Sequence, residues 1–193
     1  MNHVVCISGG IGSGKTTVCK YLESLGYPVY NSDARAKELM LNDAELRTQI
    51  IAIFGPEAYE GNRLNRGLLA NLIFKNEELK LKLEKIVHPR VREDFKQWLR
   101  VHDEPLVFKE SPIAIEIHDK SCMDIWLVTA PEHLRLTRIL HRNPNWTRED
   151  VIQRMKNQLG DHERNHIGVE CLDNSTSLES LLIQVDEALA KWT

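Results

Sequence analysis

The segment that most constrains the fold of this chain is a glycine-rich stretch at residues 9–16, with the sequence GGIGSGKT. It fits the pattern G-x-x-x-x-G-K-[ST] of phosphate-binding loops. The apolar residues 3–8 before it (HVVCIS) indicate a short buried strand. After it begins a helical pattern, whose apolar face comprises Val18, Tyr21, Leu22 and Leu25. A strand, a glycine-rich turn and a helix in this order predict a loop that wraps a phosphate group.

The chemistry of a nucleoside triphosphate accounts for each part of this pattern. Glycines adopt positive φ at little cost, so backbone N–H groups can surround phosphate oxygens, and the helix start adds partial positive charge. Lys15 is expected to reach the β- and γ-phosphates, and the Thr16 hydroxyl to bind Mg²⁺. The residues expected to contact the nucleotide are Gly10, Ile11, Gly12, Ser13, Gly14, Lys15, Thr16 and Thr17.

Composition excludes several classes of protein. A chain of 193 residues suits one domain, with or without a sizeable insertion. Its net charge of −3 argues against a nucleic-acid partner, and no apolar run is long enough for a membrane span. Because the first strand leads directly into the glycine-rich loop, we expect no signal peptide. The cysteines, Cys6, Cys19, Cys122 and Cys171, show neither C-x-x-C nor zinc spacing, so we expect a cytoplasmic protein without disulfides or structural metal.

Strand-like apolar segments alternate with helical patterns along the chain. They lie at residues 4–8, 28–30, 106–108, 125–129 and 169–172. This alternation predicts an α/β fold of the P-loop NTPase type, with a mainly parallel five-stranded sheet flanked by helices. From residue 33 to about 103 no convincing strand occurs, and so long a stretch is not one crossover helix. We expect a helical insertion there, on a nucleotide-binding core of about residues 1–32, 104–130 and 167–193.

Residues 131–166 stand out because they are rich in arginine. Pro131 can begin a helix, residues 143–146 break it, and residues 147–150 indicate a capped restart. The arginines are Arg135, Arg138, Arg142, Arg148, Arg154 and Arg164. We expect a helical lid that closes over phosphates, and the alternative is a solvated basic face balanced by nearby acids.

The phosphate loop does not specify what is done with the nucleotide. The N-K-x-D and D-x-x-G motifs of GTPases are absent from the sequence, and the chain is short for a motor or transporter ATPase. A small kinase remains, which needs acidic groups for the metal and for the attacking hydroxyl. Asp33 follows the second predicted strand, where a carboxylate can accept a proton from a hydroxyl or orient it. The alternative is that Asp33 caps the helix at residues 34–40.

Other candidate residues carry weaker local signals. Glu110 ends the apolar run 106–110. An acid in this position can bind Mg²⁺ directly or through water. The alternative is an acid that simply ends an exposed strand. His88, beside Pro89 in an interrupted helical pattern, fits a surface or capping role. Asn174 follows the last strand and can contact a nucleotide base or begin the final helix. Glu116 has little weight by itself.

Several segments match patterns that occur together in one family of kinases. Residues 8–17 (SGGIGSGKTT) are similar to T-G-G-I-G-S-G-K-S-T, and residues 28–37 (PVYNSDARAK) are similar to P-V-I-D-A-D…A-R. Residues 61–74 are similar to D-G-x-L-D-R-x-x-L…F, residues 86–89 (IVHP) to L-L-H-P, and residues 112–116 (PIAIE) to P-L-L-F-E. The positions at which this family has lid and base-contacting residues are occupied here by Arg138, Arg142, Gln158, Arg164 and Asp173-Asn174. In these patterns the chain resembles the dephospho-CoA kinase family over nearly its whole length.

The resemblance implies an activity and a set of roles. The activity is transfer of the γ-phosphate of ATP to the ribose 3′-hydroxyl of dephospho-CoA with Mg²⁺, the last step of coenzyme A biosynthesis. Asp33 becomes the catalytic base or hydroxyl-orienting group, and the acceptor pocket is lined by Arg66, His88 and Glu116. Residues 33–103 become the CoA-binding subdomain, and residues 131–166 include the lid. Arg142 would neutralise charge on the transferred group, while Arg138 and Asn174 would contact ATP.

Departures from the family pattern leave alternatives open. Asn31 replaces the first acid of D-A-D, Glu110 replaces Asp, Thr16 replaces Ser, and Val169 stands where an acid is frequent. One alternative function is another small-molecule or nucleoside monophosphate kinase. The other is an ATP-binding regulatory protein that has lost catalysis. The oligomeric state is open between a monomer and a weak homo-oligomer.

Overall fold

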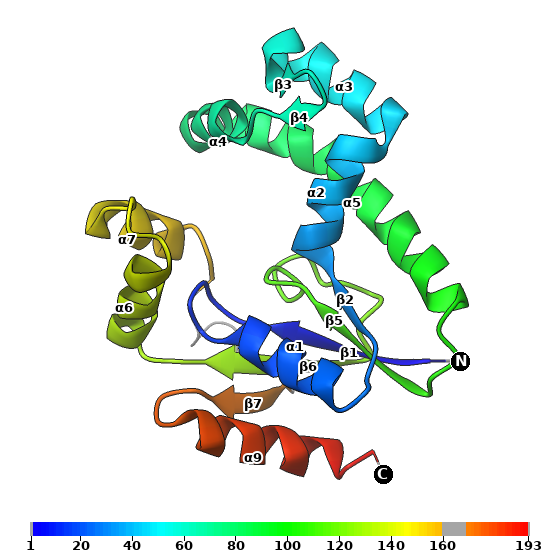
Figure 1. Cartoon of the computed structure of the whole chain (residues 1–193), viewed down its shortest axis with the longest axis vertical. Helices are drawn as coiled ribbons and strands as arrows, with labels where there is room; N and C mark the ends of the chain where they lie inside the picture. Colours follow the sequence, from blue (N-terminus) through cyan, green and yellow to red (C-terminus); the bar gives the residue numbers. More distant parts are fainter. Residues whose placement is uncertain (1, 160–168, 193) are drawn as a thin grey trace. The chain divides into compact units, whose positions relative to one another are not determined.

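Five strands form one sheet in the computed structural model, in the order β2-β5-β1-β6-β7 (Figure 1). The structure describes residues 2–159 and 169–192. The central strand β1 (His3–Ser8) pairs in parallel with β5 (Leu106–Glu110) and with β6 (Asp124–Thr129). β6 pairs in parallel with β7 (Glu170–Asp173), and β2 spans Val29–Asn31. The predicted α/β fold with a mainly parallel, five-stranded sheet is confirmed.

The hydrophobic core lies between this sheet and two helices, α1 (Lys15–Ser24) and α9 (Leu178–Leu189) (Figure 1). β1 and β5 are buried along almost their whole length, which explains why both are continuous apolar runs in the sequence. Fully buried core residues come from every layer and include Val5, Ile7, Val18, Leu22, Phe108, Trp126, Leu181 and Val185. This packing holds the carboxyl end of β1, where the glycine-rich loop begins, on a rigid platform.

The contacts divide the chain into two units. Unit 1 comprises Met1–Val29 and Asp103–Thr193, and unit 2 comprises Tyr30–His102. Besides α1 and α9, unit 1 contains the arginine-rich helices α6 (Glu132–Arg142) and α7 (Arg148–Lys156), which pack against each other. A capping box of Thr147 and Asp150 starts α7, so the predicted capped restart is confirmed. None of the helices in the described ranges has the length and apolar character that a membrane span requires.

Unit 2 is mostly helical. Its helices are α2 (Ser32–Asn42), α3 (Ala44–Phe54), α4 (Arg66–Lys75) and α5 (Glu77–Arg100). The long helix α5 contacts each of the other three, so it is the element around which the unit is organised (Figure 1).

Two expectations for this stretch are wrong. A short antiparallel pair, β3 (Tyr59–Glu60) and β4 (Arg63–Leu64), follows a 3-10 turn at Pro56–Ala58. Strands of two residues are too short to show alternation, so the sequence gives no strand signal there. The expected interruption at Pro89 is also absent, because α5 continues through that residue. Pro89 lies on an exposed part of α5, where one missing backbone hydrogen bond is tolerated.

The expectation of a protein without disulfides is contradicted as well. Cys6 in β1 and Cys122, 116 residues later, form a disulfide with their Cα atoms 5.4 Å apart. The sheet brings them together, because β6 pairs with β1 and the N–H of Met123 donates to the Val4 carbonyl at 2.9 Å. Sequence spacing carries no information about a contact made by strand pairing. Cys19 and Cys171 are not disulfide-bonded.

The disulfide closes a long loop, so reducing it is expected to destabilise the purified protein. In the chain-entropy model a loop of about 100 residues contributes about 4.7 kcal/mol to the free energy of unfolding. Urea unfolding with and without dithiothreitol should therefore show a loss of roughly this size, and Cys122→Ser should remove the dependence on reductant. Cys171→Ser, which changes an exposed cysteine outside the disulfide, is the matched control. Equal unfolding midpoints in both conditions would contradict the prediction.

Candidate active site

The glycine-rich loop joins β1 to α1 and has a backbone that only glycine accommodates at key points. Gly14 is the N-cap of α1 and has φ 114°, and a Cβ atom there would lie 2.1 Å from Asn174 Nδ2. Gly9 has φ 143°, and a Cβ atom there would lie 2.3 Å from the Val128 carbonyl oxygen. The start of α1 follows directly, and the first N–H groups of a helix point out of its N-terminal end. A turn of this geometry at a helix start is suited to an anion, which is the role that its sequence pattern predicts.

Lys15 and Thr16 open α1 at the end of the loop. Lys15 Nζ donates to the carbonyls of Gly9 at 2.8 Å and Gly10 at 3.1 Å, so its cationic head lies on the loop. The Thr16 hydroxyl donates to Glu110 Oε1 at 3.4 Å. Glu110 ends β5, and its backbone lies opposite Ile7 of β1 in the parallel register. The structure thus brings together the hydroxyl and the carboxylate that the sequence nominates as metal ligands.

Arg135 on α6 contacts the glycine-rich loop. The sequence places Arg135 among the arginines of the expected lid but does not predict this contact. Its side chain is buried, and its Nε donates to the Ile11 carbonyl at 3.0 Å. The loop is held from another side by Gln158, whose Oε1 accepts a hydrogen bond from the Ile11 N–H at 2.8 Å. The arginine-rich pattern was the available signal for Arg135, but it does not distinguish a residue that contacts the loop from one on a solvated face.

Arg138 and Asn174 form a second contact near the loop. Arg138 Nη2 donates to the Asn174 carbonyl at 2.9 Å, and Asn174 Nδ2 donates to the Ser13 carbonyl at 2.7 Å. Asn174 is buried and does not cap the final helix, which has Ser177 as its N-cap. Within residues 2–159 and 169–192, the buried Arg138 Nη1 and Ser13 Oγ have no hydrogen-bond partner. Polar atoms in this position suit a polar or anionic ligand at the loop.

The remaining arginines of the expected lid have different surroundings. Arg142 is exposed in the last turn of α6. Arg154 stacks over the Trp146 ring, with its Cζ atom 4.1 Å from the ring centroid, so its contact is with protein. Arg148 is the first residue of α7 and is exposed. Arg164, with the end of the expected lid, lies outside the described residues.

Glu116 lies in a turn-rich segment between β5 and β6, which a buried ion pair holds in place. Lys109 Nζ is 2.7 Å from Asp119 Oδ2, and these side chains are 3% and 7% exposed. Burial alone would raise the pKa of Asp119, but hydrogen bonds from Lys109 and Ser121 hold it below its usual range. Asp119 therefore stays ionised and keeps the segment that carries Glu116 attached to β5.

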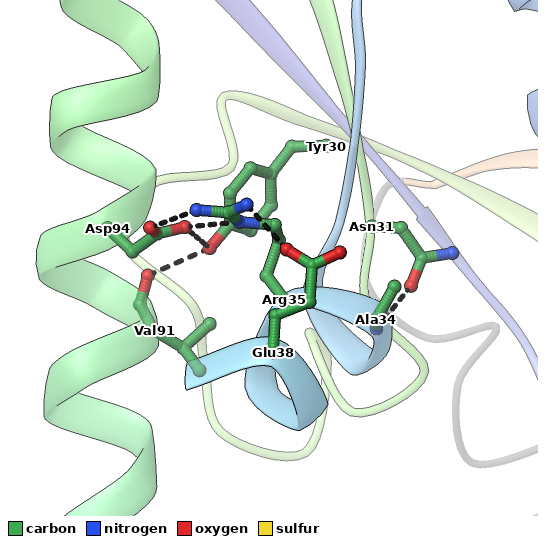
Figure 2. Close-up of polar contacts among 7 residues, drawn as sticks. All are labelled: Tyr30, Asn31, Ala34, Arg35, Glu38, Val91 and Asp94. Carbon is green, nitrogen blue, oxygen red and sulfur yellow. Dashed lines mark hydrogen bonds and ion pairs between the residues drawn. The ribbon is translucent and has the colours of Figure 1, made fainter. Parts of the chain in front are cut away.

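Asp33 lies in the first turn of α2, in unit 2, and its side chain is exposed. The alternative that Asp33 caps this helix is wrong. The N-cap is Asn31, whose Oδ1 accepts a hydrogen bond from the Ala34 N–H at 2.8 Å (Figure 2). Since Asn31 satisfies the helix start, the Asp33 carboxylate is not needed for capping.

Arg66 and His88 belong to other helices of unit 2. Arg66 is the exposed first residue of α4, whose N-cap Asn65 accepts from the Leu68 N–H at 3.0 Å. His88 is half-buried in α5, and this burial holds its pKa below the usual range. Arg92 lowers the pKa further, while Glu84 partly opposes the shift. His88 is therefore neutral near pH 7.

The fold and the loop define a class of protein. A glycine-rich turn between the central strand and the first helix, with a lysine and a hydroxyl residue at the helix start, is the phosphate site of a P-loop kinase. Shikimate kinase from Acinetobacter baumannii shares this fold, with a TM-score of 0.56 at 16% identity over 100% of this chain and 93% of that chain.

The particular family follows from closer comparisons. The dephospho-CoA kinase family matches residues 3–180. A dephospho-CoA kinase from Thermus thermophilus is 37% identical over 191 residues, 98% of this chain and 92% of the relative. The crystal structure of TT1252 from Thermus thermophilus has a TM-score of 0.87 at 36% identity, covering 100% of this chain and 98% of that chain. The chain belongs to the dephospho-CoA kinase family, and it is an ATP-dependent kinase.

Replacing Gly14 with alanine is expected to impair nucleotide binding. The left-handed backbone would be strained by about 1–3 kcal/mol, and the new Cβ atom would displace Asn174 from the loop. We expect ATP affinity to fall by at least about tenfold, measured by calorimetric titration. Gly26→Ala is the control, because Gly26 also has positive φ, 90°, but a Cβ atom there would meet no atom of the described residues within 4 Å. The prediction fails if both variants bind ATP equally well.

Protonation of His88 is expected to destabilise the protein in mild acid. Because the folded-state pKa is depressed, the unfolded chain binds this proton more readily below about pH 6.5. The contribution of neutral His88 to the free energy of unfolding is fully present above that pH. It is lost as the pH falls through the folded-state pKa. His88→Gln should flatten the pH dependence of the free energy of unfolding below about pH 6.5. His133→Gln, at an exposed position of α6, should leave the slope unchanged, and an unchanged slope in His88→Gln would refute the prediction.

Proposed function

We propose that this kinase transfers the γ-phosphate of ATP to the ribose 3′-hydroxyl of dephospho-CoA, giving coenzyme A and ADP. The observation that carries the proposal is the backbone cradle at the start of α1, with Lys15 on the loop and Thr16 beside Glu110. Membership of the dephospho-CoA kinase family supports the acceptor. In the reaction the hydroxyl oxygen bonds to the γ-phosphorus, the bond to the β-phosphate bridging oxygen breaks, and the hydroxyl proton leaves.

The loop residues are proposed to bind and orient the phosphates. Backbone N–H groups of residues 12–16 would donate to phosphate oxygens, and Lys15 Nζ would exchange its two carbonyl partners for the β- and γ-phosphates. Arg138 has a buried Nη1 suited to an anionic or polar acceptor, which supports a role for Arg138 with Asn174 in contacting ATP. Arg142, exposed at the end of α6, is proposed to neutralise charge on the transferred group.

Asp33 is proposed to accept or orient the 3′-hydroxyl proton. Its exposure and its freedom from the capping role support this assignment. Arg66, His88 and Glu116 are proposed to bind the acceptor. We also propose that residues 33–103 act as the CoA-binding subdomain and residues 131–166 as the lid, on a core of residues 1–32, 104–130 and 167–193. The mostly helical unit 2, Tyr30–His102, supports the first of these boundaries.

Mg²⁺ is the proposed cofactor, held by Thr16 and by Glu110 directly or through water. The residues fit this ion, because the hydroxyl and carboxylate lie 3.4 Å apart at the start of α1 and both are hard oxygen donors. In residues 2–159 and 169–192, no three His, Cys, Asp or Glu side chains gather as a metal site. Mg²⁺ that is bound with a nucleotide needs only one or two protein ligands. When bound, it neutralises charge on the β- and γ-phosphate oxygens.

We further propose that the protein acts in the cytoplasm, as a monomer or weak homo-oligomer, without a nucleic-acid or membrane partner. Its use of ATP supports the compartment, and its net charge of −3 supports the lack of a nucleic-acid partner.

The test of the function is Mg²⁺-dependent ADP release with dephospho-CoA, in parallel with AMP, CMP and adenosine. We expect turnover with dephospho-CoA far above the others, and a product phosphorylated at the 3′-hydroxyl. Turnover of another acceptor alone would favour a different small-molecule kinase. ATP binding without ADP release for any acceptor would favour a non-catalytic regulatory protein.

The roles of Lys15 and Asp33 are separable in one comparison. Lys15→Ala should lower kcat by on the order of 10²–10³ and weaken ATP binding, because both depend on phosphate contacts. Asp33→Asn should lower kcat and leave ATP affinity unchanged, because its carboxylate acts on the acceptor. Steady-state rates and ATP titrations of the two variants check this. If ATP affinity falls as much as kcat in Asp33→Asn, the residue is structural instead.

A further inference from the structure

Helix α2 carries the proposed catalytic carboxylate, Asp33, but it is not held by a buried apolar face. No residue between Ser32 and Asn42 is fully buried. A helix without such anchors has little hydrophobic stabilisation to fix its position. Catalysis by a carboxylate, however, needs its oxygen at hydrogen-bond distance from the reacting hydroxyl, with its position fixed to within a fraction of an ångström. Polar contacts must therefore contribute much of the restraint on this turn.

Tyr30, directly before the N-cap Asn31, provides one restraint (Figure 2). Its hydroxyl lies 2.7 Å from Asp94 Oδ2 and 3.2 Å from the Val91 carbonyl, both on α5. The single hydroxyl proton is best placed on the shorter contact, the one to Asp94. The ring is 1% exposed and packs against Phe95, with centroids 4.8 Å apart. The chain entering α2 is therefore anchored on α5.

Arg35, two residues after Asp33, provides the second restraint, because it also binds the Asp94 carboxylate. Its Nε donates to Asp94 Oδ2 at 2.9 Å, and its Nη2 donates to Asp94 Oδ1 at 2.5 Å. This two-point geometry fixes the direction of the guanidinium as well as its distance. Arg35 Nη1 also donates to Glu38 Oε2 at 2.6 Å, within α2 (Figure 2). Hydrogen bonds from Arg35 hold the pKa of Asp94 below its usual range, so the carboxylate stays ionised.

Asp94 is thus the common partner of the residues on both sides of Asp33. We propose that Asp94 is a positioning residue for the kinase reaction: it clamps Tyr30 and Arg35 to α5 and so fixes the first turn of α2, with Asp33 in it. Asp94 does not touch substrate in this role, and it acts through Asp33. The proposal rests on the role proposed above for Asp33.

A double-mutant cycle of Asp94→Asn and Asp33→Asn tests the proposal. Asp94→Asn keeps the size of the side chain but loses its charge and one carboxylate oxygen. We expect kcat to fall by on the order of ten- to a hundredfold with KM for ATP unchanged. In the Asp33→Asn background, Asp94→Asn should change kcat by less than about twofold, because there is no carboxylate left to position. Asp94→Glu, which retains the charge, should recover part of the loss.

The controls separate positioning from folding. Rates are divided by the concentration of ATP-binding sites, so a partly unfolded sample does not imitate a lower kcat. Glu93→Gln changes the neighbouring exposed acid, which pairs with Lys96 at 3.7 Å, and should keep the wild-type kcat. If Asp94→Asn does not fold, Tyr30→Phe serves instead, because it keeps the ring packing and removes only the hydroxyl; a fall in kcat is then expected.

Distinct results would overturn the proposal. Wild-type kcat in Asp94→Asn, or in Tyr30→Phe where it replaces that variant, would show that the clamp is not needed. Losses that multiply in the double variant would show that Asp94 acts independently of Asp33. If Asp33→Asn alone retains wild-type kcat, the proposed role of Asp33 fails, and the positioning role fails with it. That outcome is recognised from the single Asp33 variant.

Discussion

Parallel pairing of β1 with both β5 and β6 is the constraint on which the rest of unit 1 depends. Strands that run the same way end at the same edge of the sheet, which is where ligands bind in open α/β folds. The register Ile7↔Glu110 therefore places a carboxylate beside the start of the glycine-rich loop. Thr16, at the start of α1, then lies 3.4 Å from that carboxylate although 94 residues separate them. The same pairing brings Cys122 against Cys6, so one topological feature accounts for both contacts.

The parts of the fold that were predictable from sequence have local causes. The five strands and the glycine-rich loop follow from apolar runs and from backbone angles that only certain residues adopt, and the capping box at Thr147 follows from a four-residue pattern. The Cys6–Cys122 disulfide and the contact of Arg135 with Ile11 were not predictable, because each joins residues more than 100 positions apart. The continuation of α5 through Pro89 was missed for another reason: tertiary contacts along the helix override a local breaking tendency.

Ion pairs, one buried and one partly exposed, restrain two segments that carry candidate site residues. In unit 1, Lys109 and Asp119 fix a turn-rich segment that has no helix or strand of its own, and Glu116 lies in it. In unit 2, Arg35 and Asp94 hold a helix with no fully buried residue. Such pairs contribute little net stability, because desolvation offsets the attraction in the buried pair and solvent screens it in the partly exposed pair. Their directional contacts, by contrast, define one geometry, which is the property that a segment carrying a candidate active-site residue requires.

Asn31 shows how a departure from the family pattern is accommodated. Asparagine and aspartate are nearly equal as N-caps, so replacing the first acid of D-A-D leaves the start of α2 intact. The observed hydrogen bond from the Ala34 N–H to Asn31 Oδ1, 2.8 Å long, is the one that an aspartate would also accept. What the replacement removes is charge, and Asp33 becomes the acidic residue of the first turn. Because Asn31 satisfies the helix start, the Asp33 carboxylate is not used for capping. It is exposed and available to a hydroxyl. The substitution therefore changes the electrostatics around the proposed base while leaving in place the backbone that carries it.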